Sequence, residues 1–174
     1  MDEVLPLIAP PAAVHADDAF ERFFAGNRDR LHAALWLITR DAHEAEEIAQ
    51  ETFVRVWERW DRVGALDDPD GYLFRSAMNV FRNRRRRAKV ALRRIVGTDP
   101  TPDRLAAVEE RDAVSRSLAT LTPRQRAAIV LTDLLDMTSE DAARALGVRP
   151  STVRVLAARA RAALRDRMEG GDDE

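Results

Sequence analysis

Residues 138–161 read TSEDAARALGVRPSTVRVLAARAR, and this stretch decides the fold of the carboxyl-terminal half of the chain. Thr138 followed by Asp141 is a helix-capping pattern, and Gly147 supplies the left-handed residue that ends a short helix. Pro150 favours the first turn of a second, longer helix. This order predicts a helix-turn-helix, whose second helix lies in the major groove of DNA. A generic helical hairpin fits the same pattern.

The exposed side of the second helix favours DNA over a generic hairpin. It carries arginines beside small and hydroxyl-bearing side chains that can approach base edges. Apolar residues at helical spacing form the opposite side. The expected exposed residues are Ser151, Thr152, Arg154, Val155, Ala158, Arg159, Arg161 and Arg165, and the expected buried ones are Val153, Leu156, Ala157, Ala160, Leu164 and Met168.

Further capping patterns divide the rest of the chain into helices. They are Asp41 with Glu44, Asp68 with Pro69, and Thr122 with Pro123 and Gln125. The pattern at Thr122 opens a helix that runs through Ala127 to Leu135. Apolar spacing predicts a first helix from about Asp18 to Thr39, a second whose stripe reaches Trp60, and another amphipathic segment from Leu105 to Leu121.

The segment from Gly97 to Asp103 is linker-like, because it has turn formers and no apolar period. We therefore predict an all-α fold of two small helical domains joined by a flexible linker that lets them address separate sites. The expected bounds are a disordered tail over 1–17, a first domain over 18–94, a linker over 95–106, a helix-turn-helix domain over 107–169 and an acidic tail over 170–174.

Composition agrees with a helical, water-soluble protein. Of the 174 residues, 45% are hydrophobic and 33% charged, which provides a core beneath an ionised surface. The absence of cysteine excludes disulfides, thiolate zinc sites and cysteine nucleophiles. No apolar run approaches the roughly 20 residues that span a bilayer, and the first residues lack a signal-peptide pattern. We expect a cytoplasmic protein.

Charge is sorted along the chain. Seven acids and two arginines lie between Asp41 and Asp61, whereas nine bases and no acid lie between Gly71 and Thr98. A second basic block, from Arg144 to Arg167, has seven arginines and one acid. A face stabilised by local ion pairs would mix signs. Two cationic blocks therefore predict two contacts with one polyanion, and solvated helix faces remain the alternative.

One face of the third helix combines several groups that bind nucleic acid. Cations bind phosphates, amides read base edges, and an aromatic ring stacks on unpaired bases. The residues recur at steps of three and four: Tyr72, Arg75, Ser76, Asn79, Arg82, Asn83 and Arg86.

In this order, the motifs resemble bacterial RNA polymerase sigma factors of the extracytoplasmic-function (ECF) type, in the sigma-70 family. The matching strings are TRDAHEAEEIAQETFVRVW at 39–57, GYLFRSAMN at 71–79, RNRRRR at 82–87, LATLTPRQR at 118–126, and STVR at 151–154 with Arg159 and Arg161. The resemblance covers roughly Phe20 to Arg167. It implies a promoter-specificity subunit that binds core RNA polymerase, opens the minus-10 element and reads the minus-35 element.

The resemblance also implies residue roles. The minus-10 element, as duplex and as non-template single strand, would meet Tyr72, Arg75, Ser76, Asn79, Arg82, Asn83, Arg85 and Arg86; the minus-35 element would meet Ser151, Thr152, Arg154, Val155, Ala158 and Arg159; and core polymerase would meet Asp41, Glu44, Glu47, Gln50 and Glu51. The loop over 62–71 would hold a flipped base. Tyr72 packs in the core or stacks on a base, and the acids of the second helix are a contact face or merely solvated. An anti-sigma protein is the further partner implied.

Val155 and Ala158 stand where many family members carry polar or basic residues, so fewer hydrogen bonds reach the bases, although both can touch thymine methyl groups.

Two other classes of protein are alternatives to this interpretation. A stand-alone helix-turn-helix regulator shares the second domain but has no use for the acidic helix. An enzyme lacks support, since there is neither a glycine-rich phosphate loop nor a nucleophile with its base. His43 and Glu44 suggest a zinc-protease motif, but position 47 is Glu rather than the required second His. We expect no metal and no cofactor.

Overall fold

The computed structural model describes residues 13–96 and 117–169, and every regular element within them is a helix. The elements are α1 (Ala13–Thr39), α2 (Ala42–Trp57), α3 (Trp60–Val63), α4 (Pro69–Val96), α6 (Pro123–Ile129), η1 (Val130–Leu134), α7 (Ser139–Leu146) and α8 (Pro150–Glu169). The all-α prediction is confirmed. Residues 95 and 96 of the expected linker belong to α4, and the rest of it, over 97–106, lies outside the described residues. The expected tails up to residue 12 and from residue 170, and most of the expected helix before Leu121, also lie outside them. Within the described ranges, no helix combines the length and hydropathy needed to cross a membrane.

The predicted caps of the first helices are present. The Asp41 carboxylate accepts a hydrogen bond from the Glu44 amide at 2.9 Å, and Asp68 accepts one from the Gly71 amide at 2.7 Å. Each bond satisfies an amide that the first helical turn leaves without a partner. α1 begins at Ala13, five residues before the expected start.

The caps of the second half are confirmed as well. Thr122 and Gln125 form a reciprocal capping box at the start of α6, and Thr138 accepts a hydrogen bond from the Asp141 amide at the start of α7. Gly147 ends α7 with φ 64°, the left-handed conformation that glycine adopts without steric cost.

Two stretches differ from the predicted helices. The helix expected to run from Thr122 to Leu135 changes after Ile129 into the π-helical turn η1, which leaves the Leu134 side chain exposed. The chain also turns after Trp57 into the short helix α3, so the loop between α3 and α4 spans only residues 64–68 rather than 62–71. Wider helical turns depend on packing, and a sequence period does not reveal them.

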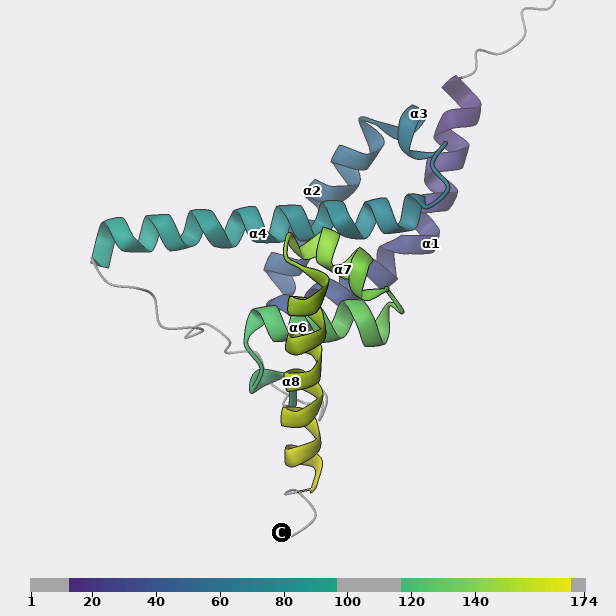
Figure 1. The fold of residues 1–174 in the computed structure, drawn as a ribbon. Coiled ribbons are helices and arrows are strands. Elements are labelled where there is room, and N and C mark those ends of the chain that lie inside the picture. Colours follow the sequence, from purple (N-terminus) through teal and green to yellow (C-terminus); the bar gives the residue numbers. More distant parts are fainter. Residues whose placement is uncertain (1–12, 97–116, 170–174) are drawn as a thin grey trace, which may run out of the picture.

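Two groups of helices pack against each other. We call α1 to α4 the first module and α6 to α8, with η1, the second module. α7 lies across α4, and α6 and η1 pack against α1 (Figure 1). Buried apolar residues of both modules, from Leu31 to Ala160, form one continuous core. The two helical domains of the prediction are present as these modules, and in this arrangement they share a core.

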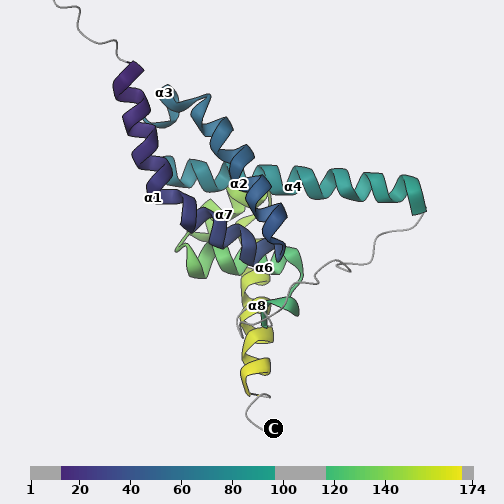
Figure 2. The ribbon, with the colours of Figure 1, turned by 180° about the vertical axis from the view of Figure 1, so that it is seen from behind.

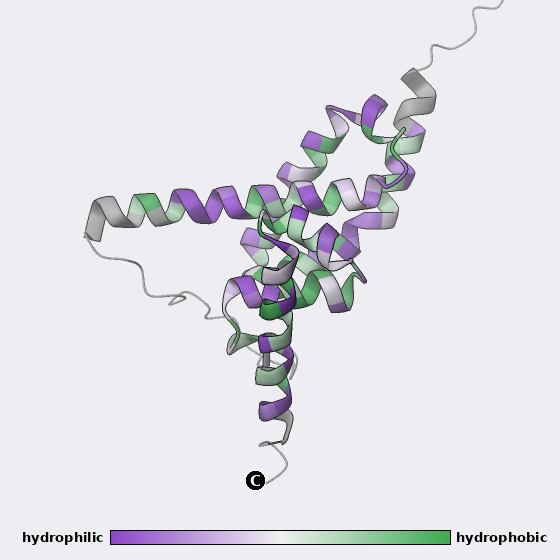
Figure 3. Cartoon of the chain, viewed as in Figure 1, coloured by the Kyte–Doolittle hydropathy of each residue, from purple (hydrophilic) through white to green (hydrophobic). Residues whose placement is uncertain are grey.

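Two helices extend beyond this shared core. The carboxyl-terminal half of α4 projects to one side, and that of α8 projects downward, in both the front and the rear view (Figures 1 and 2). α4 is hydrophilic over much of its projecting half (Figure 3). This half of α4 carries the exposed arginines Arg85, Arg86 and Arg87.

An aromatic cluster fixes the far end of the first module. The Phe20 ring on α1 lies 4.7 Å from Trp57 and 5.3 Å from Trp60, and Phe23 lies 4.9 Å from Trp60, all between ring centroids. These contacts hold α3 against α1 and so position the loop that leads into α4. Aromatic pairs at such distances contribute about 0.5–1.5 kcal/mol each beyond their buried area.

Candidate nucleic-acid interface

The predicted minus-10 residues all lie on α4, in two environments. Tyr72, Arg75 and Ser76 are half-buried near the start of the helix, whereas Asn83 and Arg86 are exposed on its projecting part. The Tyr72 ring packs against the core, and its hydroxyl accepts a hydrogen bond of 3.5 Å from Arg59. Arg85 lies over the Phe81 ring, 5.7 Å from its centroid.

Part of this face is covered by α7. Arg82 donates one hydrogen bond to the backbone oxygen of Ala145 at 3.1 Å and another to the Asn79 side chain at 2.8 Å. Ala145 lies in the last turn of α7, where backbone oxygens have no partner within the helix and carry its negative dipole end. Arg82 therefore already binds an acceptor inside the fold.

Two details show how closely the helices approach. A side chain on Gly147 would collide with the Arg82 guanidinium. The pKa of Asp141 on α7 is lowered by the hydrogen bond from Thr138, then by Arg144 and, from across the contact, by the charge of Arg75 on α4. Arg75 also lies 3.5 Å from Asp68, nitrogen to oxygen.

Arg126 joins the two modules from the inside. Its side chain is buried, with 1% exposed, and donates from Nε to the Ile38 oxygen at 2.9 Å and from Nη1 to the Leu121 oxygen at 2.8 Å. Ile38 lies in the last turn of α1, so the guanidinium satisfies a carbonyl at a helix end and complements the helix dipole. Arg126 thus caps a helix of the other module.

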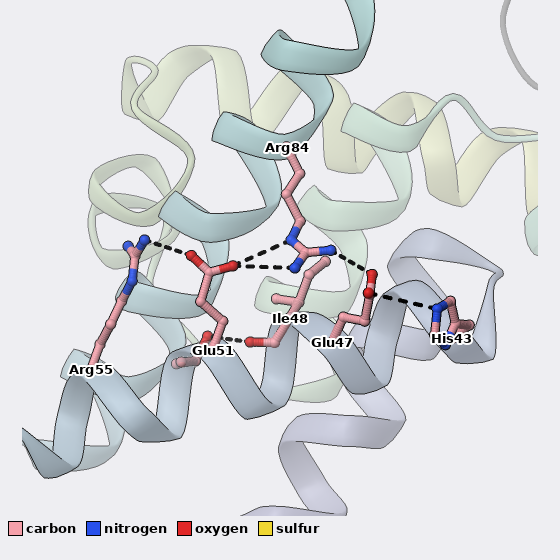
Figure 4. A network of polar contacts seen from close by, with 7 residues as sticks. His43, Glu47, Ile48, Glu51, Arg55 and Arg84 are labelled. Atoms are coloured by element: carbon pink, nitrogen blue, oxygen red, sulfur yellow. Dashed lines mark hydrogen bonds and ion pairs between the residues drawn. The ribbon is translucent and has the colours of Figure 1, made fainter.

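The predicted polymerase-contact residues lie along α2, and two of them pair with α4. Arg84 donates to Glu47 at 2.6 Å and to Glu51 at 3.3 Å from both Nε and Nη2 (Figure 4). Glu51 also accepts a hydrogen bond from Arg55 at 2.5 Å, and Glu47 lies 3.6 Å from His43. Burial lowers the pKa of Arg84, but the hydrogen bonds that it donates to both glutamates outweigh this effect, and the net shift is upward.

The other predicted polymerase residues have local partners or face solvent. The Asp41 carboxylate is occupied as the cap of α2, Glu44 is half-buried, and Gln50 is exposed and donates to Glu46 at 2.7 Å.

The predicted minus-35 residues share one open surface of α8. Ser151, Thr152, Arg154, Val155, Ala158 and Arg159 are all exposed. The opposite face is buried at Val153, Ala157 and Ala160 as expected, while Leu156 and Leu164 are only half-buried and Met168 is among the residues whose side chains are not described.

Two arginines of α8 pair with acids of the second module. Arg154 Nη1 lies 3.4 Å from Glu140 Oε1. Arg161 instead turns toward η1, where it donates two hydrogen bonds to Asp133 at 2.7 and 2.8 Å. Arg161 is exposed as expected, but Asp133 already occupies its guanidinium group.

Comparisons with known proteins decide the family. Two family models match: Sigma-70 region 2 over residues 23–90, and Sigma-70 region 4 over residues 111–164. The ECF RNA polymerase sigma factor SigM of Mycobacterium tuberculosis is 33% identical over 147 residues, which cover 84% of this chain and 75% of SigM. This chain belongs to the ECF sigma factors of the sigma-70 family. It directs RNA polymerase to promoters and is not an enzyme.

Other relatives of this sigma factor agree. The RNA polymerase sigma-E factor of Streptomyces avermitilis is 30% identical over 160 residues, covering 88% of this chain and 87% of the relative. Among solved structures, RpoE of Bartonella quintana in complex with the anti-sigma factor NepR has a TM-score of 0.67 at 22% identity, covering 86% of this chain and 96% of that one, a similarity of fold. CnrH in complex with the cytosolic domain of CnrY has a TM-score of 0.59 at 27% identity, covering 94% and 96%. The interpretation as a stand-alone regulator is set aside.

Sequence reasoning missed two arginines of this sigma factor. The sequence places Arg84 in a block of bases without acids. In the structure it pairs with Glu47 and Glu51 of α2, which lie 37 and 33 residues earlier in the chain. Arg126 was matched only as part of a motif, although it is buried between the modules. Arg84 does not fit the spacing of three and four residues that defines the expected DNA face, and this is the signal that could have separated it from the DNA-binding bases. No comparable signal marks Arg126.

Proposed function

We propose that this sigma factor binds the minus-10 element along α4 and the minus-35 element along the exposed face of α8. On α4, Asn79 and Asn83 face the bases. The phosphates are bound by Arg82, Arg85 and Arg86. The unpaired strand is bordered by Arg75, Ser76 and Tyr72. On α8, Arg154 and Arg159 bind phosphates, while Val155 and Ala158 approach thymine methyl groups. We also propose that the domains span 18–94 and 107–169, as the matched family regions support.

One observation carries the minus-10 assignment. Asn83, Arg85 and Arg86 are exposed on the half of α4 that projects beyond the other described helices, where a nucleic acid meets no steric obstacle from them. The start of the face is different, because α7 covers it at Arg82. We infer that a strand binds the whole face only after α7 has moved away from α4.

A salt titration tests this assignment. The protein with Arg85→Ala and Arg86→Ala, assembled with core polymerase on a promoter fork with an unpaired non-template strand, should bind less tightly and lose about one unit of salt slope per lost phosphate contact. Arg22→Ala, which removes an exposed arginine of α1, is the matched control and should leave the slope unchanged. An unchanged slope in the double variant would show that the two arginines are merely solvated.

We further propose that Glu47, Gln50 and Glu51 contact core polymerase from α2, with Asp41 and Glu44 supporting the start of that helix. Support comes from their exposed or half-buried places along α2. Glu47→Gln with Glu51→Gln should weaken binding to core polymerase, and unchanged affinity would refute this contact.

An anti-sigma protein is a proposed partner too, because the structurally similar sigma factor RpoE was solved in complex with the anti-sigma factor NepR. We place the protein in the cytoplasm, where its polymerase acts. Co-purification of the tagged chain from its own cells would test the anti-sigma partner. Recovery of core polymerase subunits without any further stoichiometric protein would contradict it.

A further inference from the structure

Arg84 lies on the side of α4 opposite the proposed DNA face. It continues the buried positions Leu73 and Ala77 at helical spacing, and its neighbours Asn83 and Arg85 are exposed. Its guanidinium points to α2, and in Figure 4 it lies between Glu47 and Glu51. Among the bases of α4 with a described side chain, Arg84 is therefore placed to act on the polymerase-facing helix and not on DNA.

The cluster around Arg84 leaves no oxygen of the two glutamates without a positive or imidazole neighbour. One Glu47 oxygen meets Arg84 and the other lies near His43, while one Glu51 oxygen meets Arg84 and the other meets Arg55. With His43 neutral, two carboxylates face two guanidinium groups. The formal charge of the cluster is zero, so it offers a basic partner little attraction while these pairs are intact.

The pairs are nevertheless accessible. The exposed fractions of the side chains are 32% for Arg84, 43% for Glu47 and 34% for Glu51. Ion pairs at such exposure are screened by water and contribute little, so a competing cation can replace one partner at a small cost. A basic group can thus approach the carboxylates from the solvent side.

We propose that Arg84 competes with core polymerase for Glu47 and Glu51, so that polymerase docks by exchanging ion pairs rather than by binding a bare acidic face. The proposal rests on the polymerase contact of these glutamates proposed above. In the free sigma factor, Arg84 neutralises the carboxylates and holds α4 against α2. In the complex, basic groups of polymerase take over the solvent side of the same carboxylates. Arg84 is a positioning residue that lowers the affinity for polymerase.

The test is a binding titration of full-length sigma factor with purified core polymerase, at low and at moderate salt. Arg84→Gln should tighten binding by about two- to fivefold, the factor that one partly exposed ion pair contributes, and should make the affinity more sensitive to salt. Arg87→Gln, an exposed arginine of the same run, is the matched control and should change neither quantity. In a Glu47→Gln, Glu51→Gln background, Arg84→Gln should no longer tighten binding.

Two failures are distinguishable. If Arg84→Gln binds core polymerase as tightly as the wild type or more weakly, while the double glutamine variant binds weakly, the exchange is refuted and the polymerase contact stands. If the double glutamine variant binds as the wild type does, the contact itself is refuted and the exchange falls with it. Should Arg84→Gln lose its fold in circular dichroism, Arg84→Lys serves instead. Lysine keeps the charge but cannot fork onto two carboxylates, so a smaller tightening is expected, and no tightening refutes the exchange.

Discussion

The buried contacts of Arg126 allow a quantitative prediction of how strongly the two modules are held together. Arg126→Met keeps most of the side-chain volume but removes the donors to the Ile38 and Leu121 oxygens. A buried acceptor left without a donor costs about 1–3 kcal/mol, so the substitution should lower the free energy of unfolding by about 2–6 kcal/mol. The share from Ile38, about 1–3 kcal/mol, is lost from the contact between the modules.

The tryptophans allow the two modules to be followed separately. All three, Trp36, Trp57 and Trp60, lie in the first module, so their fluorescence reports on that module, while far-UV circular dichroism reports on helices of both. In urea, the wild type should give coincident curves because the modules share one core. The variant should lose helical signal at lower urea than fluorescence. With m near 1–3 kcal/mol/M, a loss of about 3 kcal/mol moves the midpoint by about 1–3 M.

The neighbouring Arg124 provides the control. It is exposed on the same helix, and Arg124→Met should change the free energy of unfolding by less than about 0.5 kcal/mol. The reasoning is refuted if Arg126→Met unfolds in one coincident transition with the midpoint of Arg124→Met, because the buried guanidinium would then contribute nothing to the contact.

Three further predictions concern stability. Gly147→Ala should cost about 1–2 kcal/mol in thermal unfolding, because alanine is strained at φ 64°; a neutral effect would contradict the left-handed end of α7. Thr122→Ala removes the capping box and should cost about 1 kcal/mol, whereas Thr122→Ser should retain most of it; equal losses would contradict a role for the hydroxyl. The hydrogen bond from Arg161 lowers the pKa of Asp133, so this pair stabilises the protein above the ordinary aspartate pKa of about 3.9 and loses its effect as the pH falls through the lower folded value. Asp133→Asn should therefore flatten the acid side of the stability curve below about pH 4, and an unchanged curve would show that the pair contributes nothing.

Features set by residues within one helical turn were predictable from sequence. The caps at Asp41, Asp68, Thr122 and Thr138 and the glycine end at Gly147 all formed as expected. Each depends on a side chain and a backbone group no more than three residues apart, so the rest of the fold has little effect on it.

Features set by tertiary packing were not predictable. α1 ends at Thr39, and the next residue, Arg40, has φ 60°, a conformation that favours glycine and that no residue pattern indicated. The π-helical turn η1 likewise follows no local signal, because the apolar spacing through this stretch fits an ordinary helix. Packing of the second module against α1 accompanies both departures.

The charge blocks illustrate a second limit of sequence reasoning. The basic block on α4 contains no acid, and this pattern favoured a surface free to bind a polyanion. In the fold, however, Arg84 pairs with acids of the α2 block, and Arg75 lies near Asp68. Ion pairs between helices follow from three-dimensional contact, so the charge of a segment overstates the charge that it offers to a partner.

The bases that remain determine where nucleic acid first meets the protein. Arg75, Arg82 and Arg84 have partners within the fold, and the exposed Arg154 lies near Glu140. Other exposed side chains are Asn83, Arg85, Arg86 and Arg87 on α4, and Ser151, Thr152 and Arg159 on α8. The face of α8 is exposed in the described arrangement, whereas α7 contacts the α4 face at Arg82. Since long-range attraction depends on the net charge that a surface offers, we expect nucleic acid to make its first contact at these two regions. Because Arg82 donates to the Ala145 oxygen of α7, the proposed minus-10 assignment predicts that this part of the α4 face binds a strand only after the modules separate.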